Sequence, residues 1–301
     1  MFLSYLLLFI GVFACSTSGV MIRLSASDSL VLTAFRLLTG ALILLPVFLA
    51  KVRAAGGLDR EQLRRTRLPS LVLAIHLITW TVGVRMTALA QASLIVNLVP
   101  IAMPFFLLWL ASERINRAEV AGTALAIAGV LVLSIRDARA GGGSLAGDAL
   151  CFFSMILFAL YLSLGRRNRD LRSIWLYVVP VYAQAGLICL LIALPRIHGF
   201  AWGSAREWAI MVALGAIPTV CGHSILNRAM RRIRGQVVSL CNATQFVYAG
   251  LMSYLIFAEV PKPIFYPACA IVLLGLVIVV RATPPAQTDP ISEVERDLRA
   301  R

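Results

Sequence analysis

The chain has 301 residues, of which 60% are hydrophobic and only 14% are charged, and its mean hydropathy is +0.87. A soluble domain needs about 25% charged residues to cover its surface, so this composition excludes a soluble globular protein and indicates an integral membrane protein. The formal net charge of +14 does not indicate nucleic-acid binding, because the basic residues are distributed loop by loop and form no single patch.

Apolar runs near the ~20 residues that cross a bilayer predict ten transmembrane helices. In chain order they span 3–24, 29–50, 68–88, 91–111, 118–136, 146–166, 174–194, 207–227, 235–258 and 264–281. The first run lacks the basic segment of a signal peptide and is too long for one, so we expect a retained span. The polar, proline-containing stretch after Arg281 predicts a flexible cytoplasmic tail.

The distribution of Lys and Arg predicts the orientation. Of the 28 basic residues, 20 lie on the side of the predicted N-terminus, 7 lie on the other side, and Arg36 lies inside the second span. The positive-inside rule then places both termini of this multi-pass protein in the cytoplasm, and we expect it in the cell (inner) membrane.

The six cysteines all lie in predicted spans and form no CxxC pair. This pattern is typical of small buried apolar residues, so it predicts neither disulfides nor a metal site. No cofactor is expected.

The chain repeats itself at an offset of 146 residues, which places Glu113 over Glu259 and Gly129 over Gly275. Two halves of five predicted helices result. Because five is odd, the second half enters the membrane in the opposite sense, as in the inverted repeats of secondary transporters. The predicted fold class is therefore an all-α integral membrane protein with ten transmembrane helices in two inverted five-helix repeats.

Several stretches resemble the EamA family of the drug/metabolite transporter superfamily. They are LTAFRLLTGALILL (32–45), AQASLIVNLVPIAMPFFLLWLASERI (90–115), GTALAIAGVLVL (122–133), GDALCFFSMILFALYLSLGRR (147–167) and LNRAMRRIRGQVVSL with the following FAEV (226–260). The resemblance implies a first EamA repeat at 1–139, a second at 140–282 and a tail at 283–301. It also implies a cavity surrounded by helices 1, 3, 4, 6, 8 and 9. One departure is Phe246, where members of the family usually carry a second proline equivalent to Pro100.

Polar side chains inside the predicted spans are the candidates for lining that cavity. His76 and Trp80 share one helical face, as do His223 and Asn227, and amides and histidines are costly to bury in lipid. The candidate substrate-binding residues are His76, Trp80, Asn97, Pro100, Tyr161, Tyr182, His223, Asn227, Asn242, Gln245 and Tyr248. The alternative is ordinary hydrogen bonding between helices. For Arg36, which can snorkel or bind backbone carbonyls, a structural role is favoured over contact with substrate.

These patterns favour a secondary transporter that exports a small polar or zwitterionic metabolite by alternating access. The substrate would be an amino acid or an amino-acid-derived compound, such as a metallophore. An importer of the same fold is an alternative, and so is an intramembrane enzyme with Ser16 or Ser224 and a histidine. No GxSxG or HExxH motif occurs, so no enzyme is predicted. The expected partners are the small-molecule substrate and the lipid bilayer, without nucleic acid. Small residues in the fifth and tenth helices would suit a homodimer contact as well as packing within one chain.

Overall fold

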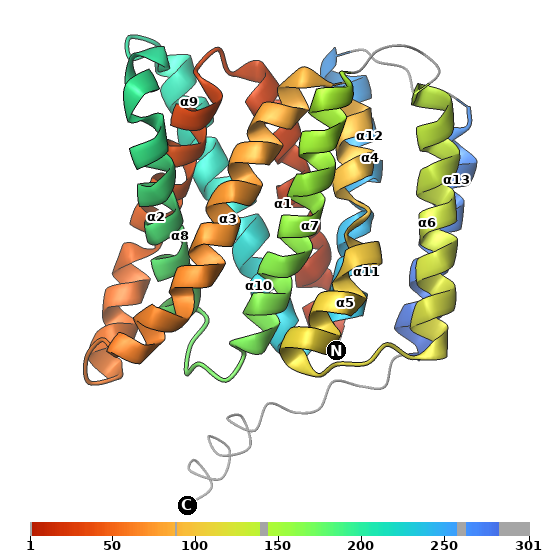
Figure 1. The fold of residues 1–301 in the computed structure, drawn as a ribbon, viewed down its shortest axis with the longest axis horizontal. Helices are drawn as coiled ribbons and strands as arrows, with labels where there is room; N and C mark the ends of the chain where they lie inside the picture. Colours follow the sequence, from red (N-terminus) through yellow and green to blue (C-terminus); the bar gives the residue numbers. More distant parts are fainter. Residues whose placement is uncertain (1, 88, 139–143, 258–262, 283–301) are drawn as a thin grey trace, which may run out of the picture.

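In the computed structural model the chain forms a bundle of roughly parallel and antiparallel helices (Figure 1). The structure describes residues 2–87, 89–138, 144–257 and 263–282, and within these ranges it contains no β-strand. Seven helical stretches in the described chain are long and apolar enough to cross a membrane. They are Leu3–Leu24, Ser29–Ala54, Arg60–Met86, Gln91–Ala111, Leu145–Arg167, Trp175–Gly199 and Ala205–Arg232. The protein is thus an all-helical, multi-pass membrane protein, while the count of ten spans stays a prediction.

The described part of the first half contains six helical segments. They are α1 (Phe2–Leu24), α2 (Ser29–Ala54), α3 (Arg60–Met86), α4 (Leu89–Val96), α5 (Val99–Ala111) and α6 (Arg117–Ala138). Helix α3 begins at Arg60, before the predicted start at 68, because Asp59 accepts a hydrogen bond from the Glu61 amide and caps a polar first turn.

Nine segments lie within residues 144–257 and 263–282 of the second half. They are α7 (Leu145–Arg167), α8 (Trp175–Ala193), the 3₁₀-helix η1 (Leu194–Gly199), α9 (Ala205–Leu214), the π-helix η2 (Gly215–His223), α10 (Ser224–Arg232), α11 (Gly235–Ala243), α12 (Gln245–Phe257) and α13 (Phe265–Ala282). The predicted span 207–227 is therefore α9, η2 and α10 in succession. Pro218 lies inside η2, where its missing N–H and bulky ring disfavour a regular α-turn, and π-turns often mark functional sites.

Two of the predicted spans are interrupted. The chain leaves the helix at Asn97–Leu98, between α4 and α5, and again at Thr244, between α11 and α12. At the first interruption Asn97 Nδ2 donates to the Ser93 carbonyl at 2.6 Å, and Gln236 Nε2 donates to the Pro100 carbonyl at 3.1 Å. These contacts satisfy polar groups that the hydrocarbon core could not. The second interruption occurs even though Phe246 stands where a proline was expected.

The two interruptions are equivalent by sequence. The offset of 146 residues relates the first residues of α4 and α11, Leu89 and Gly235, and those of α5 and α12, Val99 and Gln245. In Figure 1, α4 lies above α5 whereas α12 lies above α11, so the equivalent segments run in opposite directions.

Helices α6 and α13 form a pair at one side of the bundle (Figure 1). Their axes approach closely because glycines face each other. A Cβ atom on Gly122 would lie 2.5 Å from the Gly275 carbonyl oxygen and 2.3 Å from Val279 Cγ2. Small residues that let two backbones meet are the usual basis of helix association in membranes. The structure thus accounts for these small residues by packing within one chain.

Candidate substrate-binding cavity

A cavity of about 40 Å³ lies inside the bundle, between helices of both halves. It is lined by Cys15 and Ser18 of α1, His76, Leu77 and Trp80 of α3, Val96 of α4, Phe158 of α7, His223 of η2 and Gln245 of α12. Val96 is the last residue of α4, His223 ends η2 and Gln245 begins α12, so three irregular points of the helices meet at the cavity. This volume corresponds to about three water molecules.

Histidine and aromatic rings form one wall. The His76 ring stacks on Phe158 with centroids 4.7 Å apart and planes inclined by 8°, and His223 meets Phe158 edge-on at 5.5 Å. The Nδ1 atom of His76 contacts Ser154 twice, with the carbonyl oxygen of Ser154 at 2.9 Å and its Oγ at 2.8 Å. This wall offers flat aromatic surface beside imidazole nitrogens.

Arg36 contacts Ser18 of the lining and is 1% exposed. Its Nε donates to Thr219 Oγ1 at 3.2 Å and its Nη1 donates to Ser18 Oγ at 3.0 Å. The Trp80 indole N–H also donates to Ser18, at 3.3 Å. Within the described residues Arg36 binds hydroxyl groups rather than backbone carbonyls, and Nη2 has no partner. The partners of Arg36 are thus hydroxyls and not the expected carbonyls, while its structural role stays a prediction.

Four of the predicted site residues line the cavity: His76, Trp80, His223 and Gln245. Three others are buried in contacts around it. Asn227 Nδ2 donates to the Tyr161 hydroxyl at 2.7 Å, and the Tyr182 hydroxyl lies 3.0 Å from Ser224 Oγ. Their assignment to a substrate stays a prediction.

The remaining predicted residues lie further from the lining. Asn97 and Pro100 are buried at the interruption between α4 and α5, and Asn242 accepts a hydrogen bond from the side chain of Gln245. Tyr248 is half-buried with its ring edge-on to Phe13 at 5.5 Å. These four residues shape the helices around the cavity but are not brought into its wall.

The sequence missed part of the lining. Cys15, Leu77, Val96 and Phe158 are ordinary apolar residues, and nothing in a hydrophobic run separates a cavity wall from a packed core. Cys221 also departs from expectation, because it is exposed on the surface of the bundle while the other cysteines are wholly or partly buried; all six are free.

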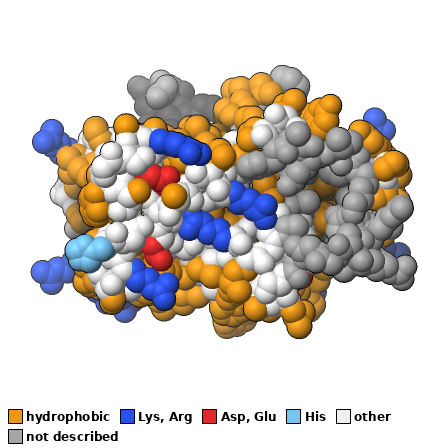
Figure 2. Space-filling view, turned by 90° about the horizontal axis from the view of Figure 1, so that it is seen from above, with side chains coloured by type: hydrophobic (Ala, Val, Ile, Leu, Met, Phe, Trp, Pro, Cys, Tyr) orange, Lys and Arg blue, Asp and Glu red, His pale blue; other side chains and the backbone are white. Residues whose placement is uncertain are grey.

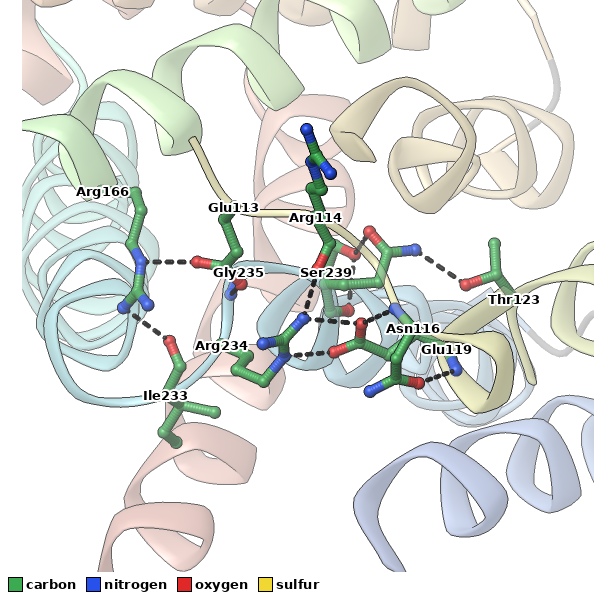
Figure 3. A network of polar contacts seen from close by, with 11 residues as sticks. Glu113, Arg114, Asn116, Glu119, Thr123, Arg166, Ile233, Arg234, Gly235 and Ser239 are labelled. Atoms are coloured by element: carbon green, nitrogen blue, oxygen red, sulfur yellow. Dashed lines mark hydrogen bonds and ion pairs between the residues drawn. The ribbon is translucent and has the colours of Figure 1, made fainter. Parts of the chain in front are cut away.

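A network of polar side chains lies at the end of the bundle that is drawn lower in Figure 1, and we call it the lower network. Figure 3 shows its side chains. Arg166 at the end of α7 pairs with Glu113 at 2.9 Å and donates to the Met230 and Ile233 carbonyls. The second Glu113 oxygen accepts from the Gly235 amide at 2.9 Å. These contacts connect the end of α5 to α7 and to the start of α11.

A second ion pair completes the lower network. Arg234 Nε lies 2.5 Å from Glu119, which is fully buried and also forms a reciprocal capping pair with Asn116 at the start of α6 (Figure 3). Hydrogen bonding to Glu119 raises the pKa of Arg234 above its ordinary value. Gln236 Nε2 donates to Thr123 Oγ1 at 2.7 Å, which joins α11 to α6. Together the two ion pairs fasten segments of both halves.

The upper end is held mainly through backbone carbonyls and hydroxyls. Arg85 donates to the carbonyls of Ser25 and Ser27 at 3.0 and 2.7 Å, and Glu207 accepts from the hydroxyls of the same serines. Arg23 donates to the Thr87 carbonyl. Figure 2 shows this end, where basic side chains lie among apolar and uncharged ones with few acidic groups.

Two stretches of the chain, residues 2–135 and 145–281, match the model of the EamA-like transporter family, which shows a two-repeat layout. The chain belongs to the EamA-like transporter family. That family assignment favours a transporter over an enzyme.

Two curated relatives are exporters by name. A probable terminal-alkyne amino-acid exporter of Streptantibioticus cattleyicolor is 25% identical over 244 residues, 76% of this chain and 79% of the relative. The aromatic amino acid exporter YddG of Ancylobacter novellus is 25% identical over 199 residues, 63% of this chain and 66% of the relative. A solved crystal structure shares the fold, with a TM-score of 0.73 and 20% identity over 91% of this chain and 96% of the other.

Proposed function

We propose that the protein is a secondary transporter that exports an amino acid or an amino-acid-derived compound by alternating access. The observation that carries the proposal is the cavity where the interrupted helices of both halves meet. In secondary transporters, substrate sites lie at the interface of two repeats, where broken helices present polar groups. The two exporter-named relatives support the substrate class.

Alternating access needs two halves that can move against each other. The equivalent segments α4–α5 and α11–α12 run in opposite directions (Figure 1), which supports an inverted repeat of two five-helix units. A cation at equivalent positions adds support. Arg23 at the end of α1 binds the Val84 and Thr87 carbonyls, and Arg166 at the end of α7 binds those of Met230 and Ile233. The two arginines are 143 residues apart, and the carbonyls they bind are 146 residues apart.

The intramembrane enzyme is the weaker alternative. The serines of that alternative have other partners: Ser16 Oγ donates to the Phe13 carbonyl at 2.6 Å, and Ser224 Oγ lies 3.0 Å from the Tyr182 hydroxyl. Among the described residues neither hydroxyl is hydrogen-bonded to a histidine, and a serine nucleophile needs such a general base. Transport across the bilayer requires no such residue.

Counterflow in liposomes tests the function. Purified protein is reconstituted into vesicles loaded with one unlabelled amino acid, and uptake of the same labelled compound is followed for aromatic, aliphatic and terminal-alkyne amino acids. We expect saturable uptake that depends on internal substrate for at least one of these classes. Uptake that is unsaturable, or product formed without flux, would contradict the proposal.

The orientation is tested with single cysteines. We propose inner-membrane insertion with both termini cytoplasmic, so a cysteine at Gly203, where a side chain meets open space, should react with an impermeant maleimide from outside. A cysteine at exposed Leu58 should react only after the cells are opened. The wild-type protein is the control for the native cysteines, and reversed labelling would contradict the orientation.

A further inference from the structure

Arg36 carries a buried positive charge that no described acidic side chain neutralises. Five ion pairs occur in the described part of the chain, and none includes Arg36. The carboxylates with described side chains all lie in loops or first helical turns, at Asp28, Asp59, Glu61, Glu113, Glu119, Asp148, Asp170 and Glu207. An isolated charge removed from water is costly unless an opposite charge meets it.

Hydrogen-bond donors next to the cavity are also left without an acceptor. Arg36 Nη2 has no partner, and Nη1 binds Ser18, which is part of the cavity lining. Ser18 Oγ accepts from both Arg36 and Trp80, and among the described residues its own proton has no acceptor. A cation and a hydroxyl therefore lie side by side with unused donors and no nearby anion.

The position of Arg36 is fixed by close packing. A Cβ atom on Gly40 would lie 2.9 Å from Thr219 Cγ2, and one on Gly215 would lie 3.1 Å from the Arg36 carbonyl oxygen. Helix α2 is thus held against the π-helix η2, and Thr219 accepts from Arg36 Nε while donating to the Leu214 carbonyl. A guanidinium held on one side and free on the other is preorganised for an anion.

We propose that Arg36, together with Ser18, binds the carboxylate of the transported compound. The inference rests on the proposed function and specifies its substrate class as one that carries a carboxylate. An amino acid would place its carboxylate on Nη2 and the Ser18 hydroxyl, while its side chain contacts the wall of His76 and Phe158. A cationic amine that lacks a carboxylate would meet an unneutralised guanidinium and be rejected by like-charge repulsion.

The test compares each amino acid with its α-carboxamide, which keeps the amine and the side chain but removes the negative charge. Phenylalanine, leucine and propargylglycine and their amides serve as probes in counterflow, and in a thermal-shift assay on the purified full chain. The variants are Arg36→Gln and Arg36→Lys. Arg64→Gln, on an exposed arginine of α3, is the matched control.

For the wild type and Arg64→Gln we expect the acid to be favoured over the amide by about tenfold or more, as for a charge-assisted hydrogen-bond pair. Arg36→Gln should reduce acid transport by at least that factor, whereas amide transport should not fall and should rise where the like-charge repulsion is relieved. Arg36→Lys should retain much of the preference for the acid over the amide, because lysine keeps the positive charge. If acid and amide fall together, or the preference survives in Arg36→Gln, the inference is overturned.

Two further measurements keep the outcomes separable. Where Arg36→Gln does not yield folded protein, Ser18→Ala replaces it, with Ser16→Ala as its control because Ser16 binds the Phe13 carbonyl and does not line the cavity. Ser18→Ala should reduce the preference for the acid over the amide, and Ser16→Ala should leave that preference unchanged. If no amino acid is transported, the proposed function fails. In that case, thermal stabilisation by the acids but not by the amides, which is lost in Arg36→Gln, would support the anion site alone. If the acids do not stabilise the protein in this way, the anion site is overturned as well.

Discussion

Trp80 combines two roles in one side chain, because its ring forms part of the cavity wall while its indole N–H donates to Ser18. That hydroxyl also receives Arg36 Nη1. Replacing Trp80 therefore changes both the shape of the wall and the orientation of a polar group. The Trp80→Phe variant keeps one aromatic ring in the wall and removes the indole N–H together with the second ring.

We expect Trp80→Phe to lower the counterflow rate about two- to tenfold, which is the loss of one neutral hydrogen bond, and to leave the melting temperature nearly unchanged. Trp109→Phe is the matched control, because Trp109 is 74% exposed on the outer surface. Equal rates for the two variants would show that the Ser18 contact does not affect transport.

The sequence predicted the polar part of the cavity better than its apolar part. His76 and Trp80 lie four residues apart on one helical face, and that spacing led to both. Phe158 could not be predicted in this way, because a phenylalanine in a hydrophobic span fits lipid, core and cavity equally well. The partners of Arg36 could not be predicted from the sequence, since its hydrogen bonds to hydroxyls on α1 and η2 depend on packing between distant segments.

At the scale of helices, the α6–α13 pair depends on three glycines rather than on polar contacts. Gly122, Gly129 and Gly275 each leave too little space for a Cβ atom, with the nearest atoms 2.3 to 2.9 Å away. Dispersion contacts between backbones fall off steeply with separation, so a single larger side chain should disrupt the pair.

Gly122→Leu should therefore lower the melting temperature and the yield of monodisperse protein, whereas Ala124→Leu, at an exposed position of α6, should change neither much. Thermal unfolding followed by size-exclusion chromatography measures both. A Gly122→Leu protein as stable as Ala124→Leu would mean that the close approach of α6 and α13 is unimportant for stability.

Helix positions followed directly from the sequence, but helix interruptions followed only in part. Apolar runs of membrane length indicated every long helix, and Asn97 with Pro100 and Pro104 marked the first interruption. The second interruption, at Thr244, has no proline in the residues beside it. Its local contacts are hydrogen bonds of the Thr244 hydroxyl to the Cys241 carbonyl and of the Gln245 side chain to Asn242, which polar residues in a span do not predict by themselves.

At the scale of the whole molecule, the lower network joins the two halves at one end. Glu113 and Arg166 are each about one-tenth exposed, so removing either charge leaves the other poorly solvated. Opening this end requires Glu113 to leave both Arg166 and the Gly235 amide. The network is therefore suited to control access from that side.

Glu113→Gln should make the cavity more accessible from the end that carries the lower network. The readout is the rate at which an impermeant maleimide modifies a cysteine placed at Val96, which lines the cavity, in inside-out vesicles. Glu61→Gln is the control, because its ion pair with Arg64 is exposed and contributes little. An unchanged rate in Glu113→Gln would argue against a gating role.

Energy coupling is also a property of the whole molecule. Every carboxylate with a described side chain lies near a helix end or in a loop, so none is placed in the middle of the membrane to carry a proton. We expect counterflow without a pH gradient, and little change in steady-state accumulation when a gradient is imposed. Accumulation that follows the gradient, and loses that dependence in His76→Ala but not in the loop control His198→Ala, would instead identify His76 as the coupling residue.

The lower network lacks a full counterpart by sequence at the other end of the molecule. The offset of 146 residues relates Arg234 to Ala88 and Glu119 to Phe265, and neither of these can form an ion pair. If more ion pairs stabilise the conformation closed at one end than the conformation closed at the other, the two conformations are unequally populated. Each factor of ten in the ratio of their populations corresponds to about 1.4 kcal/mol. Apparent affinity scales with the fraction of protein that is ready to bind. An otherwise symmetric carrier would thus bind the same solute more weakly when it approaches from the fastened side.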